Sequence, residues 1–231
     1  MVRYLRLKRH RVRADGIRSV LPVVVEKTRR YGPVLHEQKI SVKRWVLITG
    51  AHQSGKTRWL QRMLDEAPGI WRRNPAMLLR CVHPLGQWIE HEPIRAYAEQ
   101  RYARQWSRIR SWERIDAAVA WIEENRPVLL IDDAHLVTGR KLDVLLRMVR
   151  AAPLAVVTAS DEQRIAVSLR MEIAARNPQR IHLHSDAAYD ITPFVVWTFT
   201  LAALAAGFWE LSAVGAGLSL LGRGRRAARQ T

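Results

Sequence analysis

The feature that most constrains the fold is an eight-residue stretch between an apolar run and a helical pattern. Residues 50–57 read GAHQSGKT and match the pattern G-x-x-x-x-G-K-[ST]. The apolar run Trp45–Thr49 precedes them, and a helical pattern with Leu60, Met63 and Leu64 follows. In this setting the match is typical of a loop whose backbone N–H groups and helix N-terminus hold phosphate oxygens. The alternative is a glycine-bearing turn that matches by chance, and the flanking strand and helix disfavour it.

Each residue type in this loop has a role in holding a nucleotide. Glycines let the backbone wrap closely around phosphate oxygens, Lys56 reaches the β- and γ-phosphates, and the hydroxyl of Thr57 is a ligand for Mg²⁺. The expected nucleotide-binding residues are Gly50, Ala51, His52, Gln53, Ser54, Gly55, Lys56 and Thr57. The loop therefore predicts a nucleoside phosphate bound together with Mg²⁺.

Between about 44 and 185, short apolar runs alternate with helical patterns, as in a parallel sheet covered by helices. The expected strands are Trp45–Thr49, Ala76–Val82, Val128–Asp132, Leu154–Thr158 and Arg180–Leu183. Apolar residues repeat at helical spacing over 115–122 and again over 142–149. These two repeats predict amphipathic helices between the strands.

A second chemical signal is the stretch RPVLLIDDAHL, in which a buried strand ends on Asp132 and Asp133. A doubly wound sheet presents side chains to its ligand at such a strand end. We expect Asp132 to bind Mg²⁺, directly or through water, and Asp133 to orient or deprotonate the attacking water. A strand end followed by a helix cap is the alternative, and the upstream phosphate loop disfavours it.

With both motifs in place, residues 44 to 185 resemble a P-loop NTPase of the additional-strand class, most similar to the AAA+ ATPases. Within that family they are most similar to the branch of replication initiators, helicase loaders and transposition regulators. The resemblance makes Gly50–Thr57 the Walker A motif and 131–133 the Walker B motif. It implies a three-layer α/β sandwich with a central parallel sheet, ATP and Mg²⁺ as cofactors, and Thr158 as the polar sensor of the γ-phosphate.

The resemblance also implies a homo-oligomer, because in AAA+ rings an arginine from the neighbouring subunit completes the site. Arg176 is the expected finger, with Arg170 and Arg180 as alternatives, and any of the three can instead be a solvated surface residue. The chain departs from the family at two points. The second Walker B acid is Asp133 rather than the Glu of many relatives. About ten residues separate the last expected strand from an apolar tail, so the usual helical lid is missing or replaced.

The charge is strongly positive. Lys and Arg number 38 against 21 Asp and Glu, which gives a net charge of +17, and ten of these basic residues fall within the first thirty positions. We expect residues 1–43 to form a basic arm, with a short helix from about 15 to 30, that binds nucleic acid or an anionic membrane face. Arginine enrichment by a GC-rich genome is the simpler alternative. The single cysteine, Cys81, excludes an internal disulfide and fits a reducing compartment.

Basic and aromatic residues alternate in a second segment, 95–114. We expect Arg101, Arg104 and Arg108 to share one face of a helix, with Tyr102 and Trp106 on another. Arginine beside aromatic rings suits phosphate contacts and base stacking, so this segment is a second candidate contact for nucleic acid. The alternative is an ordinary amphipathic helix whose aromatic rings pack in the core.

The tail is nearly uncharged over residues 193–222, where Glu210 is the single charged residue. A helix of that length exceeds the hydrocarbon thickness of a bilayer. We expect residues 191–222 to be a transmembrane or membrane-embedded segment, either a single span or a re-entrant hairpin, followed by an Arg-rich tail at 223–231. That tail favours the cytoplasmic face of a bacterial-type inner membrane. A buried helical hairpin in place of the lid is the alternative.

The leading hypothesis is a membrane-associated AAA+-like ATPase whose ATP binding and hydrolysis control its assembly on, or action upon, nucleic acid. A second hypothesis is a membrane-embedded assembly or secretion ATPase that resembles the phage-morphogenesis NTPases. A third is a nucleotide-gated scaffold that binds ATP with little turnover. Retention on DNA separates the first hypothesis from the others, and turnover separates the third.

Overall fold

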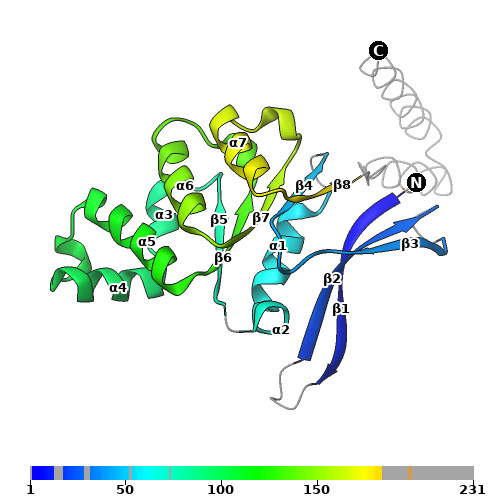
Figure 1. Ribbon diagram of the computed structural model, residues 1–231, viewed down its shortest axis with the longest axis horizontal. Helices are drawn as coiled ribbons and strands as arrows, with labels where there is room; N and C mark the ends of the chain where they lie inside the picture. Colours follow the sequence, from blue (N-terminus) through cyan, green and yellow to red (C-terminus); the bar gives the residue numbers. More distant parts are fainter. Residues whose placement is uncertain are drawn as a thin grey trace, which may run out of the picture. The chain divides into compact units, whose positions relative to one another are not determined.

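The computed structural model describes residues 2–12, 18–28, 32–51, 54–72, 74–183 and 198. One compact unit, Met1–Asp186, holds all the helices and strands discussed below (Figure 1). Within the described residues, no helix is both long enough and apolar enough to cross a membrane. The apolar run 193–222, except Thr198, and the Arg-rich tail 223–231 lie outside the described residues.

A five-stranded parallel sheet forms the centre of this unit. Its strands are β4 (Val46–Gly50), β5 (Ala76–Arg80), β6 (Val128–Asp132), β7 (Leu154–Ala159) and β8 (Gln179–Leu183). All five expected strands are confirmed. The strand order is β5-β6-β7-β4-β8 and every pairing is parallel, so β7 lies between the strand that leads into the phosphate loop and the strand that ends on the acids. This is a P-loop-like α/β arrangement with one additional strand between the two motifs.

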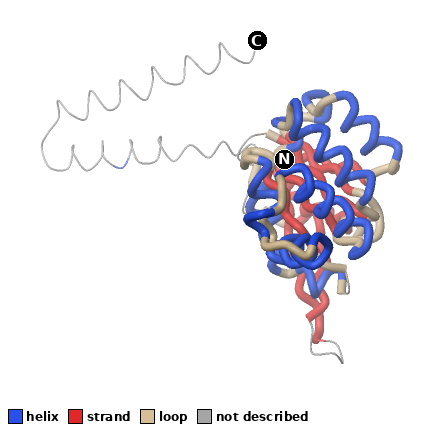
Figure 2. Tube along the Cα trace, turned by 90° about the vertical axis from the view of Figure 1, so that its left-hand side faces the viewer, coloured by secondary structure: helices blue, strands red, loops and turns tan. Residues whose placement is uncertain are grey.

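Helices lie on both sides of the strands in Figure 2. They are α1 (Lys56–Asp65), α2 (Ala67–Trp71), α3 (Leu85–Ile89), α4 (Glu92–Tyr102), α5 (Ser111–Asn125), α6 (Gly139–Ala151) and α7 (Val167–Ala175). The two amphipathic repeats expected at 115–122 and 142–149 fall within α5 and α6, so both are confirmed. Every residue of β6 and β7 is buried, which explains why these strands are continuous apolar runs rather than alternating ones.

In the N-terminal region expected to be a basic arm, the described residues form an antiparallel sheet. Its strands are β1 (Val2–Val12), β2 (Arg18–Lys27) and β3 (Val34–Lys39), in the order β1-β2-β3. The short helix expected from about 15 to 30 is wrong, because β2 occupies most of that range. The β-branched run Val23–Val25 favours a strand, and all three of its side chains are buried.

This antiparallel sheet contacts the parallel one through α1, α2 and β8. The tightest approach is at Gly69 in α2, where an added Cβ would lie 2.5 Å from the carbonyl oxygen of Arg18 in β2. A second attachment joins the linker after β3 to β8: the Ser41 amide donates to Gln179 Oε1 at 2.7 Å, and Gln179 Nε2 donates to the Lys39 carbonyl at 3.0 Å. The N-terminal sheet is therefore held against the helix that follows the phosphate loop.

Candidate nucleotide-binding site

The phosphate loop joins β4 to α1, as the motif requires. Gly50 ends β4, and a Cβ there would lie 2.9 Å from both Cβ and the carbonyl oxygen of Leu183, so the neighbouring strand β8 leaves room only for glycine. Gly55 precedes α1 with φ +82°, a left-handed conformation that favours glycine. Of the eight expected binding residues, His52 and Gln53 lie outside the described residues. The two motif glycines thus serve different purposes. Gly50 allows the close approach of β8, and Gly55 allows the left-handed turn before α1.

Lys56 is the first residue of α1, and its side chain is folded over the loop. Its Nζ donates to the carbonyl oxygens of Gly50 at 2.8 Å and Ala51 at 2.9 Å and to Ser54 Oγ at 3.0 Å. Burial lowers the pKa of the Lys56 ammonium, and the carboxylates of Asp133 and Asp132 oppose that shift. Three neutral acceptors and two nearby carboxylates hold the ammonium where phosphate oxygens would meet it.

Thr158 connects the two acids across the β6–β7 pairing. Its hydroxyl donates to Asp132 Oδ1 at 2.7 Å and accepts from the backbone N–H of Asp133 at 3.2 Å. Thr158 is fully buried and Asp132 is 4% exposed. The hydroxyl therefore orients one carboxylate and fixes the backbone of the next residue. The structure brings Asp132, Asp133 and Thr158 together, and the role of Thr158 as a sensor of the γ-phosphate stays a prediction.

Asp133 adopts a left-handed backbone conformation, with φ +54°, at the start of the 3₁₀ turn Ala134–Leu136. Aspartate tolerates this region better than most residues, yet the conformation persists only where the surroundings hold it. Here the hydrogen bond that the Asp133 amide donates to Thr158 Oγ1 supplies part of that constraint. The side chain is half-buried, so solvent reaches the carboxylate that was expected to handle the attacking water.

His135 lies close enough to these acids for their charges to affect its imidazole, and the sequence alone did not predict a role for it. The Ser160 amide donates to its Nδ1 at 3.3 Å, and the Ser160 carbonyl accepts from the Gly50 amide at 3.2 Å. Burial lowers the pKa of the His135 imidazole; Asp133 opposes the shift, while Arg164 and Lys56 reinforce it. The signal in sequence was its place two residues after the second acid. Its backbone-mediated link to the phosphate loop is visible only in the structure.

A second group that sequence did not reveal lies next to Asp132. Lys141 in α6 donates from Nζ to the Cys81 carbonyl at 2.5 Å and lies 5.3 Å from the centre of the Trp88 ring. The Cys81 amide donates to the Asp132 carbonyl at 3.0 Å. Burial raises the pKa of the Cys81 thiol to about 12, so this cysteine stays protonated and unreactive at neutral pH.

The donor set fits Mg²⁺ bound with nucleotide phosphates. Mg²⁺ takes oxygen ligands, and in nucleotide sites the protein supplies one or two while water and phosphates supply the rest. The Thr57 hydroxyl, exposed in the first turn of α1, and the Asp132 carboxylate are ligands of that kind. Within the part of the chain that the structure describes, no cluster of three or more His, Cys, Asp or Glu side chains could hold an ion by itself.

The expected arginine finger, Arg176, lies away from the phosphate loop of its own chain. Its guanidinium lies 5.4 Å from the centre of the Trp45 ring, and Trp45 precedes β4 at the end opposite the loop. The same group lies 3.7 Å from Glu172 and donates to the Arg150 carbonyl at 3.4 Å. Of the alternatives, Arg180 pairs with Glu162 at 3.2 Å. A role for Arg176 in a neighbouring subunit stays a prediction.

The Arg/aromatic segment 95–114 differs from its expected form. Helix α4 ends at Tyr102 because Ala103 turns left-handed with φ +50°, so Arg101, Arg104 and Arg108 do not share a helical face. The aromatic rings are used locally: Arg114 lies 4.5 Å from the centre of the Trp106 ring, and the Tyr102 hydroxyl donates to the Glu113 carbonyl at 3.3 Å. The contacts of Tyr102 and Trp106 therefore fit rings that pack within the protein better than rings that stack on bases.

Comparisons with known proteins leave the family open. No protein family matches the sequence, and no curated protein matches it. Similar solved structures include domain III of the replication initiation protein DnaA from Thermotoga maritima, at 13% identity and TM-score 0.39, covering 74% of this chain and 67% of that one. Another is a signal transduction ATPase with numerous domains from Pyrococcus horikoshii, at 13% identity and TM-score 0.34, covering 74% of this chain and 25% of that one.

Proposed function

We propose that the chain is an ATP hydrolase of the P-loop class. The observation that carries the proposal is the hydrogen-bonded group of Asp132, Asp133 and Thr158 at the ends of β6 and β7. In the strand order β5-β6-β7-β4-β8, these residues and the phosphate loop with Lys56 follow the carboxyl ends of parallel strands. They therefore lie at the same edge of one sheet. If residues 50–57 matched the phosphate-loop pattern only by chance, nothing would require two acids at the end of β6.

The residues of the chain divide the work of hydrolysis. With nucleotide bound, the Lys56 ammonium would contact β- and γ-phosphate oxygens in place of its carbonyl and hydroxyl acceptors, and Thr57 and Asp132 would hold the ion. Bound Mg²⁺ supplies neutralisation of the charge that develops on the transferred phosphoryl group. Asp133 orients the attacking water and accepts its proton, while Thr158 keeps both acids in place. Asp133 is one methylene shorter than glutamate, and its backbone is held in a left-handed conformation.

Two substitutions test these roles. Lys56→Ala removes the group that contacts the phosphates and should abolish nucleotide binding. Asp133→Asn keeps the size of the side chain but cannot take a proton, so binding should remain while turnover falls by about 100-fold or more. Binding is measured with a fluorescent ATP analogue and turnover by phosphate release. Equal loss of binding in both variants would contradict the division of roles.

A second candidate function is a nucleotide-gated scaffold, and the Asp in place of Glu at position 133 favours it. In this case ATP binds and switches assembly, but hydrolysis is slow. Turnover of purified wild-type protein decides between the two. Phosphate release no faster in wild type than in Asp133→Asn, with nucleotide binding intact, would establish the scaffold and remove the hydrolase proposal.

We further propose that this ATPase forms a homo-oligomer, acts on nucleic acid and is held at the cytoplasmic face of a bacterial-type inner membrane by residues 193–222. The net charge of +17 supports a polyanionic partner, and thirty nearly uncharged residues closed by four arginines support the membrane segment. A membrane-embedded assembly or secretion ATPase has the same anchor without the nucleic acid. Carbonate extraction of membranes tests the anchor: the intact chain should stay with the membrane, and a chain truncated after Asp190 should not.

A further inference from the structure

A small cavity of about 250 Å³ lies at the carboxyl end of β5, between α1 and the segment that follows the strand. β5 is an edge strand of the parallel sheet, and its last residue, Arg80, pairs in register with Asp132 of β6. The polar side chains that line the cavity are Gln61 of α1, Arg80, His83, Gln87 and His91. The cavity therefore lies near the candidate nucleotide-binding site, but it shares no residue with the phosphate loop.

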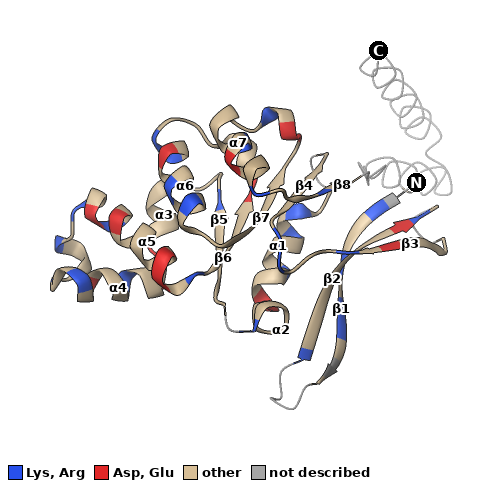
Figure 3. Ribbon diagram, viewed as in Figure 1, with Lys and Arg blue, Asp and Glu red and all other residues tan. Residues whose placement is uncertain are grey.

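The lining of this cavity is rich in hydrogen-bond donors and positive at one point. A guanidinium carries five N–H groups, each amide side chain two and each imidazole at least one. Figure 3 shows the basic position at the end of β5, which is the one charged residue of that strand. Among the described residues that line the cavity, there is no Asp or Glu. A lining of this kind suits an oxyanion.

Arg80 is held in place by its neighbours and keeps most of its donors. Its Nη2 donates to Gln61 Oε1 at 2.8 Å, and its carbonyl oxygen accepts from Trp88 Nε1 at 2.8 Å. The Trp88 ring is itself held, because the Lys141 ammonium lies 5.3 Å from its centre. In the described ranges of the chain, no acidic side chain pairs with the half-buried guanidinium of Arg80. A preorganised cation without an acid beside it favours an anionic ligand.

His91 supplies a second and independent observation. Its Nδ1 is buried, and the part of the chain that the structure describes offers this atom no hydrogen-bond partner. Buried polar atoms in folded proteins are nearly always hydrogen-bonded, because leaving one unpaired destabilises the folded state. The side chain of His91 makes no cap hydrogen bond to α4, the helix that it precedes. An oxyanion in the cavity that His91 lines would accept a hydrogen bond from this nitrogen.

We propose that the cavity binds a small phosphate-type oxyanion, either inorganic phosphate or a phosphomonoester. A guanidinium binds two phosphate oxygens at once, and the imidazoles and amides of the lining supply donors for the others. The cavity is smaller than the about 300 to 1,000 Å³ of ordinary ligand pockets, which favours a small anion over a whole nucleotide. The proposal goes beyond the proposed function and requires neither binding nor hydrolysis of ATP.

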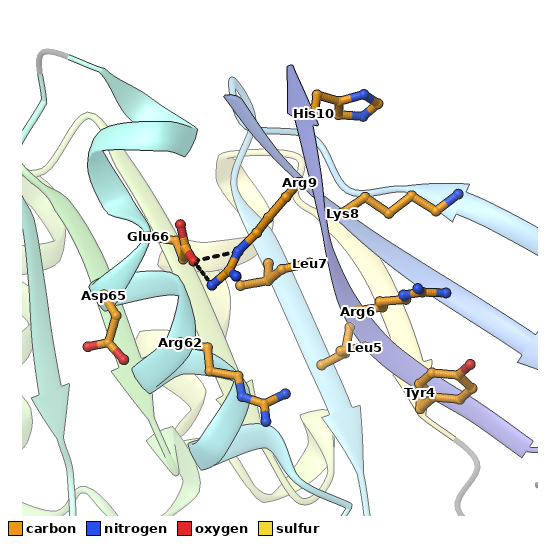
Figure 4. Close-up of a pocket in the computed structure, with 10 residues that line it drawn as sticks. All are labelled: Tyr4, Leu5, Arg6, Leu7, Lys8, Arg9, His10, Arg62, Asp65 and Glu66. Atoms are coloured by element: carbon orange, nitrogen blue, oxygen red, sulfur yellow. Dashed lines mark hydrogen bonds and ion pairs between the residues drawn. The ribbon is translucent and has the colours of Figure 1, made fainter. Parts of the chain in front are cut away.

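A larger groove, of about 920 Å³ between β1 and the end of α1, does not gather such a set of donors. Arg9 already pairs there with Glu66, and Asp65 also lines the groove. Arg6 and Lys8 project from the side of β1 that faces away from α1 (Figure 4). The cations of β1 are thus either neutralised or directed elsewhere, whereas Arg80 is not paired with an acid.

A purely structural role is the competing explanation for Arg80. The hydrogen bond to Gln61 ties β5 to α1, and a water molecule would serve Nδ1 of His91. If this explanation is correct, Arg80→Gln lowers the thermal midpoint by the same amount with and without phosphate. If the cavity binds phosphate, the ligand stabilises the folded chain and Arg80→Gln removes that extra stabilisation.

The test measures phosphate binding by isothermal titration calorimetry on the Lys56→Ala chain, in which the phosphate loop has lost its lysine. Inorganic phosphate should bind, and adding Arg80→Gln should weaken it by about tenfold or more, because a cation is replaced by a neutral amide. On the chain with Lys56 intact, Arg80→Gln should remove one bound phosphate. Glycerol phosphate is titrated in parallel: tighter binding than inorganic phosphate assigns the site to a phosphomonoester, and weaker binding assigns it to free phosphate.

His91→Phe separates a ligand contact from a structural one. It keeps an aromatic ring and removes both nitrogens, so phosphate affinity should fall. Without phosphate, the thermal midpoint should stay the same or rise, because the unpaired buried nitrogen is gone. A lower midpoint together with unchanged phosphate affinity would show that His91 does not contact the ligand and would overturn the proposal.

The matched control is Arg62→Gln, which removes the same charge from an exposed position of α1 outside the cavity. Phosphate affinity in this variant should stay at the value of its parent chain. An equal loss in Arg62→Gln and Arg80→Gln would show that phosphate only screens the net charge of the protein. Equal binding of acetate at the same ionic strength, or no phosphate binding by Lys56→Ala, would also overturn the proposal.

Binding of the ATP analogue keeps the two proposals apart. If Lys56→Ala binds phosphate in the cavity while the wild-type chain neither binds nor hydrolyses ATP, the proposed function alone is contradicted. If the wild-type chain hydrolyses ATP while Lys56→Ala binds no phosphate, the cavity proposal alone is contradicted.

Discussion

At the residue scale, the candidate site depends on one buried hydroxyl. Thr158 donates to Asp132 and accepts from the Asp133 amide, so a single side chain serves both acids. It is fully buried, and no solvent replaces those two hydrogen bonds when the hydroxyl is lost. The geometry of these two candidate site acids is thus set from β7, a strand that itself carries no acid.

Thr158→Val tests that dependence, because it keeps the shape and removes the hydroxyl. It leaves the Asp133 amide unsatisfied, so stability should fall by about 1–3 kcal/mol and turnover should fall more than nucleotide binding. Urea unfolding and phosphate release measure the two effects. Thr138→Val is the control, because the exposed Thr138 makes no side-chain cap hydrogen bond to α6. Similar losses in both variants would show that Thr158 has no special role.

His135 gives a pH dependence with a definite sign. Its pKa in the folded protein lies below the ordinary value, chiefly through burial. When pH falls through the ordinary histidine range near 6.5, the unfolded chain takes up a proton before the folded one does. Stability without nucleotide should therefore fall from about pH 7.5 to 5.5. His135→Gln should reduce that fall, as measured by urea midpoints, and an unchanged slope would contradict the prediction.

At the element scale, the sequence predicts the parallel sheet well and the antiparallel sheet poorly, for one physical reason. β6 and β7 are buried on both faces and read as continuous apolar runs. β1 is an edge strand, so its apolar side chains, Leu5 and Leu7, are separated by Arg6 and framed by other cations. Apolar and charged residues do alternate within β1, but the many cations favoured the interpretation as a basic arm over a strand.

The end of α4 was unpredictable for a different reason. Left-handed helix ends usually carry Gly or Asn, and this one carries Ala103. The turn is held by a tertiary contact, in which the Trp106 amide donates to Glu99 Oε1 at 2.7 Å. Among the site residues, Lys56, Asp132 and Asp133 follow from motif spacing. Lys141 and the backbone link of His135 come from elements whose approach only the fold determines.

Gly69 should be essential to the junction between the N-terminal sheet and α2. A Cβ added at this position would meet the Arg18 carbonyl at 2.5 Å, and backbone cannot move aside as a side chain can. Gly69→Ala should therefore cost about 1–3 kcal/mol of unfolding free energy. Gly86→Ala in α3 is the matched control, because a Cβ there meets nothing within 4 Å. Chemical denaturation measures the free energy of unfolding of both variants. An unchanged value in Gly69→Ala would show that the junction between β2 and α2 is loose.

At the scale of the whole molecule, α1 connects the candidate nucleotide site to the N-terminal sheet. The helix begins at Lys56, whose ammonium lies over the phosphate loop, and Glu66 caps its C-terminal end. Its ten residues span about 15 Å, a distance across which a packed helix moves as one body. The Arg9–Glu66 ion pair holds its far end against β1. A change at either end therefore acts on the same rigid element.

This connection predicts that the ion pair at the far end of α1 affects nucleotide binding. If the pair of Arg9 with Glu66 sets the position of α1, Glu66→Gln should change the affinity for the ATP analogue by about fivefold or more, which corresponds to about 1 kcal/mol. Asp116→Asn is the control, because its carboxylate pairs with Arg147 at the surface and the substitution should leave that affinity unchanged. An affinity that neither variant changes would show that α1 carries the ion pair and the phosphate loop without coupling them.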